Sequence, residues 1–380
     1  MNITIVGGGN IGTALCAELA HNGHCVSLMT SKPKQFQTEL SVVFADNDQT
    51  VSGRIHRISD LPQDVLPSAE MIIVTLPAFL MKSFADSALP HVRPGAIMIA
   101  MPGYGGVEFI FKEFVKKGVI LVGFQRVPAV YRLIEAGRCS RMSGRRPALH
   151  FAALPACKTI EVKNTLEAVF SMPCIPLQNY LCVTLTPSNP ILHTTRLYSL
   201  FGDLPADGTL AQNPLFYGEW SPSASHWLIR CDRELQQMLA RIPLDLHEVV
   251  SLKVHYESDT EEAMTQKLRS IRSLHDIRSP MIEDNGRYRI DWDSRYFQAD
   301  FPFGLAIIRG IAELFDSPTE AIDVVLSWYA KSVGLEYYLP DGSFAGKDLN
   351  KTGIPQNYGI HSADSFIQIY TGDRNNAKED

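Results

Sequence analysis

The sequence lacks the features that mark disulfide-rich, zinc-binding and membrane-spanning proteins. Its seven cysteines are an odd number, lie far apart and include no C-x-x-C pair. We therefore expect reduced thiols, with neither a disulfide framework nor a metal site. No segment approaches the roughly 20 apolar residues that span a bilayer. The first residues also lack the basic and then apolar stretches of a signal peptide. We expect a cytoplasmic protein with no membrane partner.

An excess of positive charge is missing as well. The 380 residues include 35 Lys and Arg against 41 Asp and Glu, which gives a formal net charge of −6. Because proteins that bind nucleic acids normally carry a basic surface, no nucleic-acid partner is expected. At roughly 100–200 residues per domain, the length predicts two domains, each large enough to build its own core.

The first half of the chain alternates short apolar runs with helical patterns. A helical pattern runs from Ile11 to Asn22. The apolar runs are Ile3–Val6, Cys25–Met29, Met71–Leu76, Ala96–Met101 and Val119–Phe124. Continuous apolar runs of this length are typical of strands that are buried on both faces of a parallel sheet. The alternation predicts an α/β fold that begins with a Rossmann domain, a doubly wound parallel sheet.

The pattern changes near residue 180, and the rest of the chain has mainly helical periodicity. Ile322, Val325 and Tyr329, for example, fall on one face of a helix. The segment 317–320, Ser-Pro-Thr-Glu, predicts the start of that helix, with a capping box and proline at the first helical position. We therefore predict a Rossmann domain over residues 1–182 and a mainly α-helical domain over residues 183–380.

A glycine-rich segment follows the first predicted strand and opens the first predicted helix. It fits G-x-G-x-x-G, a motif that is weak alone but specific in this context. Gly7 permits a tight turn, Gly9 lets the main chain approach a pyrophosphate, and Gly12 lets the helix pack closely on the sheet. The helix N-terminus then offers free N–H groups to the phosphates. The residues predicted to bind a dinucleotide here are Gly7, Gly9, Asn10, Ile11 and Gly12.

The end of the second predicted strand bears on the choice of dinucleotide. Enzymes that use NAD usually place Asp or Glu there, to bind the ribose 2′-hydroxyl. This chain has Thr30, Ser31 and Lys32 at that place and no carboxylate. Hydroxyl groups and a cation suit a 2′-phosphate, so the sequence favours NADP(H), with NAD(H) as the alternative. The alternative is that Lys32 and Lys34 only belong to a solvated loop.

Loops at the carboxyl ends of the next two strands should line the same crevice, because cofactors bind along that edge of a doubly wound sheet. The residues predicted to contact the cofactor from these loops are Leu76, Pro77 and Pro102.

Two segments of the second half carry candidate catalytic side chains. His193 follows a Ser-Asn-Pro turn, and Asp300 precedes Phe301 and Pro302 in another turn. Histidine titrates near neutrality and can both donate and accept a proton. A carboxylate that bonds one ring nitrogen would fix the tautomer and stabilise the imidazolium. The sequence does not show that the two side chains meet. A packing histidine and a helix-capping aspartate are the alternatives.

These segments together resemble the octopine/nopaline-type opine dehydrogenases, which depend on NAD or NADP. The resemblance covers nearly the whole chain. It rests on the glycine-rich motif, on Ser-Asn-Pro-Ile-Leu-His at 188–193, and on Ala-Asp-Phe-Pro-Phe-Gly-Leu at 299–305. The last segment looks like the acidic D-x-P-F-G-L segment of that family. Gln-Arg-Val-Pro at 125–128 is similar to bacterial members of the staphylopine dehydrogenase type.

The resemblance implies an oxidoreductase that acts on CH–NH bonds. An amino acid amine would condense with an α-keto acid, and the imine would be reduced by the nicotinamide. By the same resemblance, His193 would relay the proton and Asp300 would be its partner.

A substrate with two carboxylates needs cationic or amide groups near the site, and arginine is their natural bidentate partner. The candidates are Arg196, one turn after His193, and Arg295, five residues before Asp300. Asn189 could orient the nicotinamide or the substrate, and Tyr217 could line the amino acid pocket. Surface arginines and an aromatic core turn are the alternatives.

Two other functions stay open. Enzymes similar to ketopantoate reductase or the 3-hydroxy acid dehydrogenases use a lysine as proton donor, and the helix around Lys267 could supply it. A Rossmann domain can also belong to a non-catalytic module that senses NAD(P). A homodimer is the default oligomer. Neither the substrates nor the physiological direction can be derived from the sequence.

Overall fold

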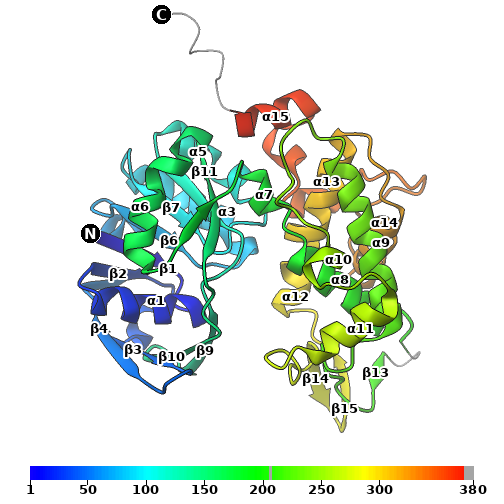
Figure 1. Cartoon of the computed structure of the whole chain (residues 1–380), viewed down its shortest axis with the longest axis horizontal. Helices are drawn as coiled ribbons and strands as arrows, with labels where there is room; N and C mark the ends of the chain where they lie inside the picture. Colours follow the sequence, from blue (N-terminus) through cyan, green and yellow to red (C-terminus); the bar gives the residue numbers. More distant parts are fainter. Residues whose placement is uncertain (205–207, 372–380) are drawn as a thin grey trace, which may run out of the picture. The chain divides into compact units, whose positions relative to one another are not determined.

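The structure, a computed structural model, describes residues 1–204 and 208–371. The chain forms two compact units (Figure 1). The first unit comprises residues 1–184 and the described residues from 368 on, and the second comprises residues 185–367. The predicted fold class is confirmed: a Rossmann-type α/β unit is followed by a mainly α-helical one.

The C-terminal helix α15 (Ala363–Thr371) begins in the second unit and ends in the first. There the hydroxyl of its Tyr370 donates a hydrogen bond of 2.9 Å to the buried carboxylate of Glu108. The predicted helical domain ran from residue 183 to the end of the chain. The observed helical unit ends at Ile367 instead, because the last turn of α15 packs in the first unit.

The main sheet of the first unit has eight strands in the order β12-β11-β8-β7-β6-β1-β2-β5. From β8 to β5 all neighbours are parallel, whereas β11 runs antiparallel to β8. The strands are β1 (Asn2–Val6), β2 (Cys25–Met29), β5 (Arg57–Ser59), β6 (Met71–Val74), β7 (Ile97–Ala100), β8 (Ile120–Phe124), β11 (Leu149–Leu154) and β12 (Cys174–Pro176).

Both faces of this sheet are buried. Ile73 belongs to the core cluster that includes residues of α1 and α6, whereas Ile72 and Val74, equally buried, point to the opposite face. Coverage of both faces explains why the strands are continuously apolar. The helices of the unit are α1 (Asn10–His21), α2 (Pro62–Val65), α3 (Ala78–Ala88), α4 (Val107–Ile110), α5 (Lys112–Lys116), α6 (Thr159–Phe170) and α7 (Leu181–Thr184), with short helices η1 (Pro33–Gln35), η2 (Leu89–His91) and η3 (Ala156–Lys158).

A second sheet, which the sequence analysis did not predict, packs across α1 (Figure 1). Its strands, in spatial order, are β4 (Thr50–Arg54), β3 (Glu39–Phe44), β10 (Cys139–Ser143) and β9 (Val130–Glu135). A Cβ atom on Gly53 would lie 2.5 Å from the carbonyl oxygen of Ala17, so glycine is needed where β4 crosses the helix. Helix α1 is thus enclosed between two sheets.

The second unit is built around α8, which packs against α9 and against the short helix η4. Its helices are α8 (Ser188–Phe201), α9 (Pro222–Leu239), α10 (Leu252–His255), α11 (Glu261–Ser270), α12 (Arg295–Gln298), η4 (Phe301–Leu305), α13 (Ala306–Leu314), α14 (Glu320–Ser332), η5 (Lys347–Lys351) and η6 (Pro355–Tyr358). A small sheet adds β13 (Thr209–Leu210), β15 (Arg287–Ile290) and β14 (Met281–Asp284), paired in that order.

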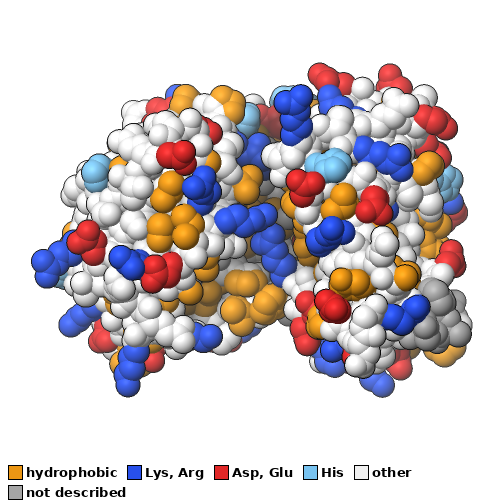
Figure 2. Space-filling model, turned by 90° about the horizontal axis from the view of Figure 1, so that it is seen from below, with side chains coloured by type: hydrophobic (Ala, Val, Ile, Leu, Met, Phe, Trp, Pro, Cys, Tyr) orange, Lys and Arg blue, Asp and Glu red, His pale blue; other side chains and the backbone are white. Residues whose placement is uncertain are grey.

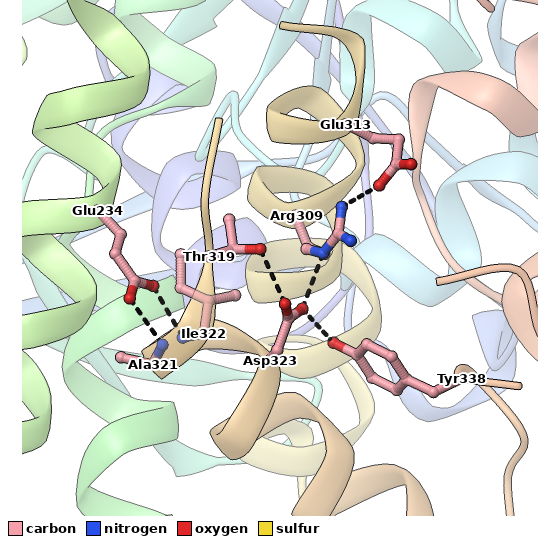
Figure 3. Close-up of polar contacts among 8 residues, drawn as sticks. All are labelled: Glu234, Arg309, Glu313, Thr319, Ala321, Ile322, Asp323 and Tyr338. Carbon is pink, nitrogen blue, oxygen red and sulfur yellow. Dashed lines mark hydrogen bonds and ion pairs between the residues drawn. The ribbon is translucent and has the colours of Figure 1, made fainter. Parts of the chain in front are cut away.

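The start of α14 differs from the prediction. The helix begins at Glu320, so the capping box predicted at residues 317–320 is wrong. Its first N–H groups are satisfied by a distant side chain, since Glu234 of α9 accepts hydrogen bonds from Ala321 N (2.6 Å) and Ile322 N (3.0 Å; Figure 3). A carboxylate from another helix replaces the local cap because it also neutralises the positive end of the α14 dipole.

A second polar contact ties α14 to α13. Asp323 of α14 accepts hydrogen bonds from the Nε of Arg309 (2.7 Å), from the Tyr338 hydroxyl (2.7 Å) and from the Thr319 hydroxyl (3.0 Å). Arg309 also pairs with Glu313 (Figure 3). These contacts fix the two helices against each other inside the second unit.

The surface carries charges of both signs. On the face drawn in Figure 2, basic and acidic side chains are interspersed on both units. None of the described helices is long and apolar enough to cross a membrane. Within residues 1–204 and 208–371, no three His, Cys, Asp or Glu side chains are grouped so that they could hold a metal ion.

Candidate active site

The glycine-rich loop has the geometry that a dinucleotide needs. Gly7 has a φ of 107°, which favours glycine, and its N–H bonds the carbonyl oxygen of Met29 at 2.9 Å. A Cβ on Gly12 would lie 1.8 Å from the Gly7 carbonyl oxygen, so no larger residue fits. A Cβ on Gly9 would meet nothing within 4 Å, which leaves its main chain open to a ligand. The residues present therefore fit a bound pyrophosphate.

Asn10 and Ile11 form the first turn of α1, and both are partly buried. The side-chain oxygen of Asn10 accepts a hydrogen bond of 2.9 Å from Leu133 N, and its carbonyl oxygen accepts one of 3.0 Å from the Ser140 hydroxyl. The Asn10 side chain thus holds the second sheet against α1. What Asn10 can offer a phosphate is its main-chain N–H at the helix N-terminus.

The loop after β2 carries the residues predicted to choose between NADP and NAD. Ser31 and Lys32 are exposed, and Lys32 N donates a hydrogen bond of 3.4 Å to the Thr30 hydroxyl. Further along this loop, the ring of Phe36 lies so close to Gly8 that a Cβ there would be 2.2 Å from it. The sequence analysis missed Phe36, because only folding brings it to the glycine-rich loop.

The other predicted cofactor residues follow β6, which is next to β1 in the sheet, and β7, which is next to β6. Thr75 connects them to the glycine-rich loop, since its hydroxyl lies 3.0 Å from the Val6 carbonyl oxygen and 3.2 Å from that of Gly7. The three residues predicted from this edge are Leu76 and Pro102, which are half-buried, and Pro77, which is exposed.

In the second unit, His193 and Asp300 are in direct contact, as the family resemblance implied. The His193 Nδ1 lies 2.8 Å from Oδ2 of Asp300, and the two side chains are only 8% and 9% exposed. His193 lies within α8, and Asp300 directly precedes η4. The two helices approach closely at Gly304, where a Cβ would lie 3.2 Å from a side-chain carbon of Pro190. The glycine and proline of the two sequence motifs therefore bring the pair together.

Tyr217 contacts the other nitrogen of the same ring. Its hydroxyl lies 2.9 Å from the Nε2 of His193. Two more aromatic rings surround the imidazole, with centroid distances of 5.6 Å to Phe216 and 4.7 Å to Tyr296. Burial, with smaller contributions from Tyr296 and other neighbours, raises the pKa of Tyr217 well above its usual range. The phenol therefore stays protonated.

The guanidinium of Arg196 makes its hydrogen bonds to the main chain of the protein itself. Its Nε donates to the carbonyl oxygen of Phe216 (2.8 Å), and one terminal nitrogen donates to those of Leu215 (3.1 Å) and Glu219 (2.7 Å). It is 1% exposed and lies over the Trp220 ring. Burial lowers its pKa to about 10, so the group stays charged at neutral pH. The predicted contact of Arg196 with a substrate carboxylate is thus replaced by a structural role, because its donors hold the 215–219 segment.

Arg295 and Asn189 lie near the histidine in different ways. Arg295, on α12, is exposed, and its guanidinium lies 5.9 Å from the centre of the Tyr296 ring, which itself contacts His193. Asn189 is half-buried in the first turn of α8. The structure therefore brings His193, Asp300, Tyr217 and Arg295 into one region of the second unit, and the predicted cofactor residues into one edge of the first.

A glycine-rich loop on a Rossmann sheet, joined to a helical unit with a buried His–Asp pair, defines a two-domain nucleotide-dependent dehydrogenase. Residues 176–333 match the family described as NAD/NADP octopine/nopaline dehydrogenase, alpha-helical domain. Residues 3–133 match the family described as ketopantoate reductase PanE/ApbA.

Similar proteins extend over most of the chain. Tauropine dehydrogenase of Arabella iricolor is 27% identical over 80% of this chain and 81% of its own length. Octopine dehydrogenase of Mizuhopecten yessoensis is 24% identical over 87% and 86%. Solved structures of octopine dehydrogenase, one with NADH and L-arginine and one with NADH and pyruvate, superpose with a TM-score of 0.84 at 23% identity, covering 96% of this chain and 97% of theirs. Over most of its length the chain is thus similar to tauropine and octopine dehydrogenases, which are oxidoreductases, and its residues 176–333 match the NAD/NADP octopine/nopaline dehydrogenase helical domain.

Proposed function

We propose that this protein catalyses the reductive condensation of an amino acid with an α-keto acid, using a reduced nicotinamide dinucleotide. The observation that carries the proposal is the buried contact between His193 Nδ1 and Asp300. The relatives support the substrate class, since they are named tauropine and octopine dehydrogenases, and octopine dehydrogenase has been solved with L-arginine and with pyruvate.

In this reaction His193 carries the proton. It takes a proton from the amine as the amine attacks the keto carbon, while the keto oxygen is protonated from solvent to give a carbinolamine. His193 then gives its proton to the carbinolamine hydroxyl, which leaves as water, so that an iminium ion remains. Asp300 keeps the ring in one orientation and stabilises the imidazolium that forms between these steps. The bound nicotinamide supplies the hydride that reduces the imine carbon.

The substrate carboxylates need partners that are charged and reachable. Arg295 is the candidate that meets both conditions, because it is exposed and its guanidinium lies beside the Tyr296 ring, which contacts His193. We infer that Arg295 binds one carboxylate, with Asn189 as a polar neighbour. Arg196 acts indirectly, by holding the segment that carries Tyr217.

For the cofactor, we propose the edge of the first unit formed by the glycine-rich loop and by the loops after β2, β6 and β7. NADP(H) is favoured over NAD(H), because hydroxyls and the exposed Lys32 follow β2 where NAD enzymes usually have a carboxylate. The pyrophosphate would lie at the N-terminus of α1.

The proposal is tested by following the loss of reduced nicotinamide absorbance with NADPH, and separately with NADH. Each is combined with a matrix of amino acids and α-keto acids. Condensation predicts oxidation only where an amine and a keto acid are both present. Oxidation with a keto acid alone would identify a hydroxy acid dehydrogenase, and binding without any oxidation would identify a sensor.

A ketopantoate reductase-like reaction is the second candidate, because residues 3–133 match that family. Such enzymes would use a lysine as proton donor, and Lys267 was the candidate. Its ammonium pairs with the exposed Glu257 at 2.8 Å, so it is already engaged in a surface ion pair. The two reactions are distinguished by His193, which the lysine-based reaction does not need.

A further inference from the structure

The Tyr217 hydroxyl occupies the ring nitrogen of His193 that faces away from Asp300. Because a carboxylate only accepts hydrogen bonds, its 2.8 Å contact places the proton of the neutral ring on Nδ1. The Nε2 atom then has a lone pair, and the Tyr217 hydroxyl donates to it at 2.9 Å. A substrate oxygen that exchanges a proton with His193 must therefore either displace the Tyr217 hydroxyl from Nε2 or exchange the proton through that hydroxyl.

The surroundings of Tyr217 favour proton exchange through its hydroxyl over displacement of the hydroxyl. The ring stacks on Trp220 with an interplanar angle of 17° and meets Phe216 edge to face. The main chain on either side is fixed by Arg196, whose buried guanidinium donates to the carbonyl oxygens of Leu215, Phe216 and Glu219. Moving the hydroxyl away from His193 would require this segment to move. Such a movement would leave buried hydrogen-bonding groups without partners, which is unfavourable.

On the basis of the proposed condensation, we propose that Tyr217 is a catalytic residue whose hydroxyl passes the proton between His193 Nε2 and the substrate oxygen. As the carbinolamine loses water, the O–H bond of Tyr217 breaks and its proton goes to the departing oxygen. The Nε2–H bond of the imidazolium breaks at the same time and restores the O–H bond of Tyr217. The C–O electron pair leaves with the water, and the nitrogen lone pair forms the C=N bond.

Tyr217 is neutral before and after this step, and the charge of the His193 imidazole ring changes from +1 to 0. In the preceding addition step the same path in reverse carries one proton of the attacking amine to His193, while the keto oxygen takes up a proton from solvent. A neutral phenol throughout agrees with the surroundings, because burial and the nearby Asp300 disfavour a tyrosinate and raise the pKa of Tyr217.

The test compares Tyr217→Phe with Tyr198→Phe, a tyrosine of α8 that packs on Trp227 and Trp328 and lies away from the imidazole. The measurements are single-turnover oxidation of the reduced cofactor, which gives the rate constant, and steady-state kinetics, which give KM. Both use pyruvate and the amino acid that reacts fastest in the condensation assay. Tyr217→Phe should lower the rate constant by ~10²-fold or more, with little change in KM, and Tyr198→Phe should not. An unchanged rate constant with a raised KM would overturn the proposal, because Tyr217 would then only line the pocket.

Mixtures of H₂O and D₂O provide a readout that a structural role would not change. Two protons in motion predict a curved dependence of the wild-type rate on the deuterium fraction, and a linear dependence would contradict the relay. Nitrogen-15 NMR of the protein without substrate should show a protonated Nδ1 and an unprotonated Nε2 on His193. A protonated Nε2 in the neutral ring would overturn the proposal even if Tyr217→Phe did not fold.

Failure of the proposed condensation can be distinguished from failure of the Tyr217 relay. If no amino acid supports oxidation by the wild type, condensation is excluded. The same variants are then compared in reduction of an α-keto acid alone, where the relay again predicts a slower Tyr217→Phe.

Discussion

At the scale of single residues, the His193–Asp300 contact has a close counterpart on the surface. His226 pairs with Glu261 at 2.8 Å, but both of these side chains are more than 40% exposed. His193→Ala should lower turnover by ~10²–10⁴-fold, the usual contribution of a general acid and base, and should leave cofactor affinity nearly unchanged. His226→Ala should retain full turnover. Steady-state kinetics with wild-type activity in His193→Ala would exclude its role.

The proposed preference for NADP(H) also depends on single side chains. Lys32→Ala should weaken NADPH binding more than NADH binding, because it removes the cation proposed for the 2′-phosphate. Lys163→Ala, in a surface pair with Glu167 on α6, is the matched control. Fluorescence titration checks both affinities. Equal affinity of the wild type for NADPH and NADH would mean that the loop after β2 binds no phosphate.

Glu108 is a buried carboxyl group whose ionisation should make the stability of the protein depend on pH. One oxygen accepts from the hydroxyls of Thr184 and Tyr370, and the other has no hydrogen-bond partner among the described residues. Burial raises the pKa of Glu108 from 4.5 to about 7. The folded protein therefore keeps a proton that the unfolded chain releases, and its stability falls as the pH rises between these values.

Replacing this carboxyl by an amide should remove the pH dependence. The rise in pKa corresponds to about 3 kcal/mol at most, so Glu108→Gln should be more stable than wild type at pH 8 and similar near pH 5. Thermal unfolding at both pH values measures the difference. A constant difference between the two proteins would show that Glu108 ionises normally.

The sequence predicted His193 and Asp300 as candidates through the family resemblance, because each lies in a short motif with a recognisable turn. It did not locate the role of Arg196, because the three carbonyl groups that it binds lie about twenty residues later in the chain. Phe36 was missed for the same reason. Its position against Gly8 depends on how the loop after β2 folds back, which no local pattern records.

At the scale of elements, the start of α14 depends on Glu234 of α9. Glu234→Ala should lower the free energy of unfolding by about 1–3 kcal/mol, because two buried N–H groups lose their acceptor. The exposed Glu320→Gln on α14 itself should change it by less than about 0.5 kcal/mol. Urea unfolding distinguishes the two variants. Equal effects would mean that α14 does not need this cap.

Strands were predictable where burial is complete and not elsewhere. β6 is buried at every position, so its apolar run is visible in the sequence. β9, by contrast, buries only Tyr131, and five of its six residues are exposed. The second sheet therefore leaves no periodic pattern in β9, although it encloses α1 through contacts such as that of Gly53.

At the scale of the whole molecule, the change of pattern near residue 180 reflects the step from the sheet-based unit to the helical one. The return of α15 to the first unit was not predictable, because the pattern of apolar residues in a helix does not specify which of two cores the helix packs against. The cytoplasmic location and the homodimer stay predictions. The chemistry proposed for the helical unit rests on short motifs, whereas its substrates depend on a pocket assembled from distant residues.

The central claim is that hydride reaches a carbon bonded to nitrogen. The most direct measurement uses NADPH deuterated at the transferring position of the nicotinamide, pyruvate and the amino acid that reacts fastest, followed by mass spectrometry of the products. Condensation predicts one deuterium on the carbon that joins the former keto acid to the amine of a secondary amine dicarboxylate. Deuterium found instead in a hydroxy acid, with the amino acid unchanged, would contradict the account.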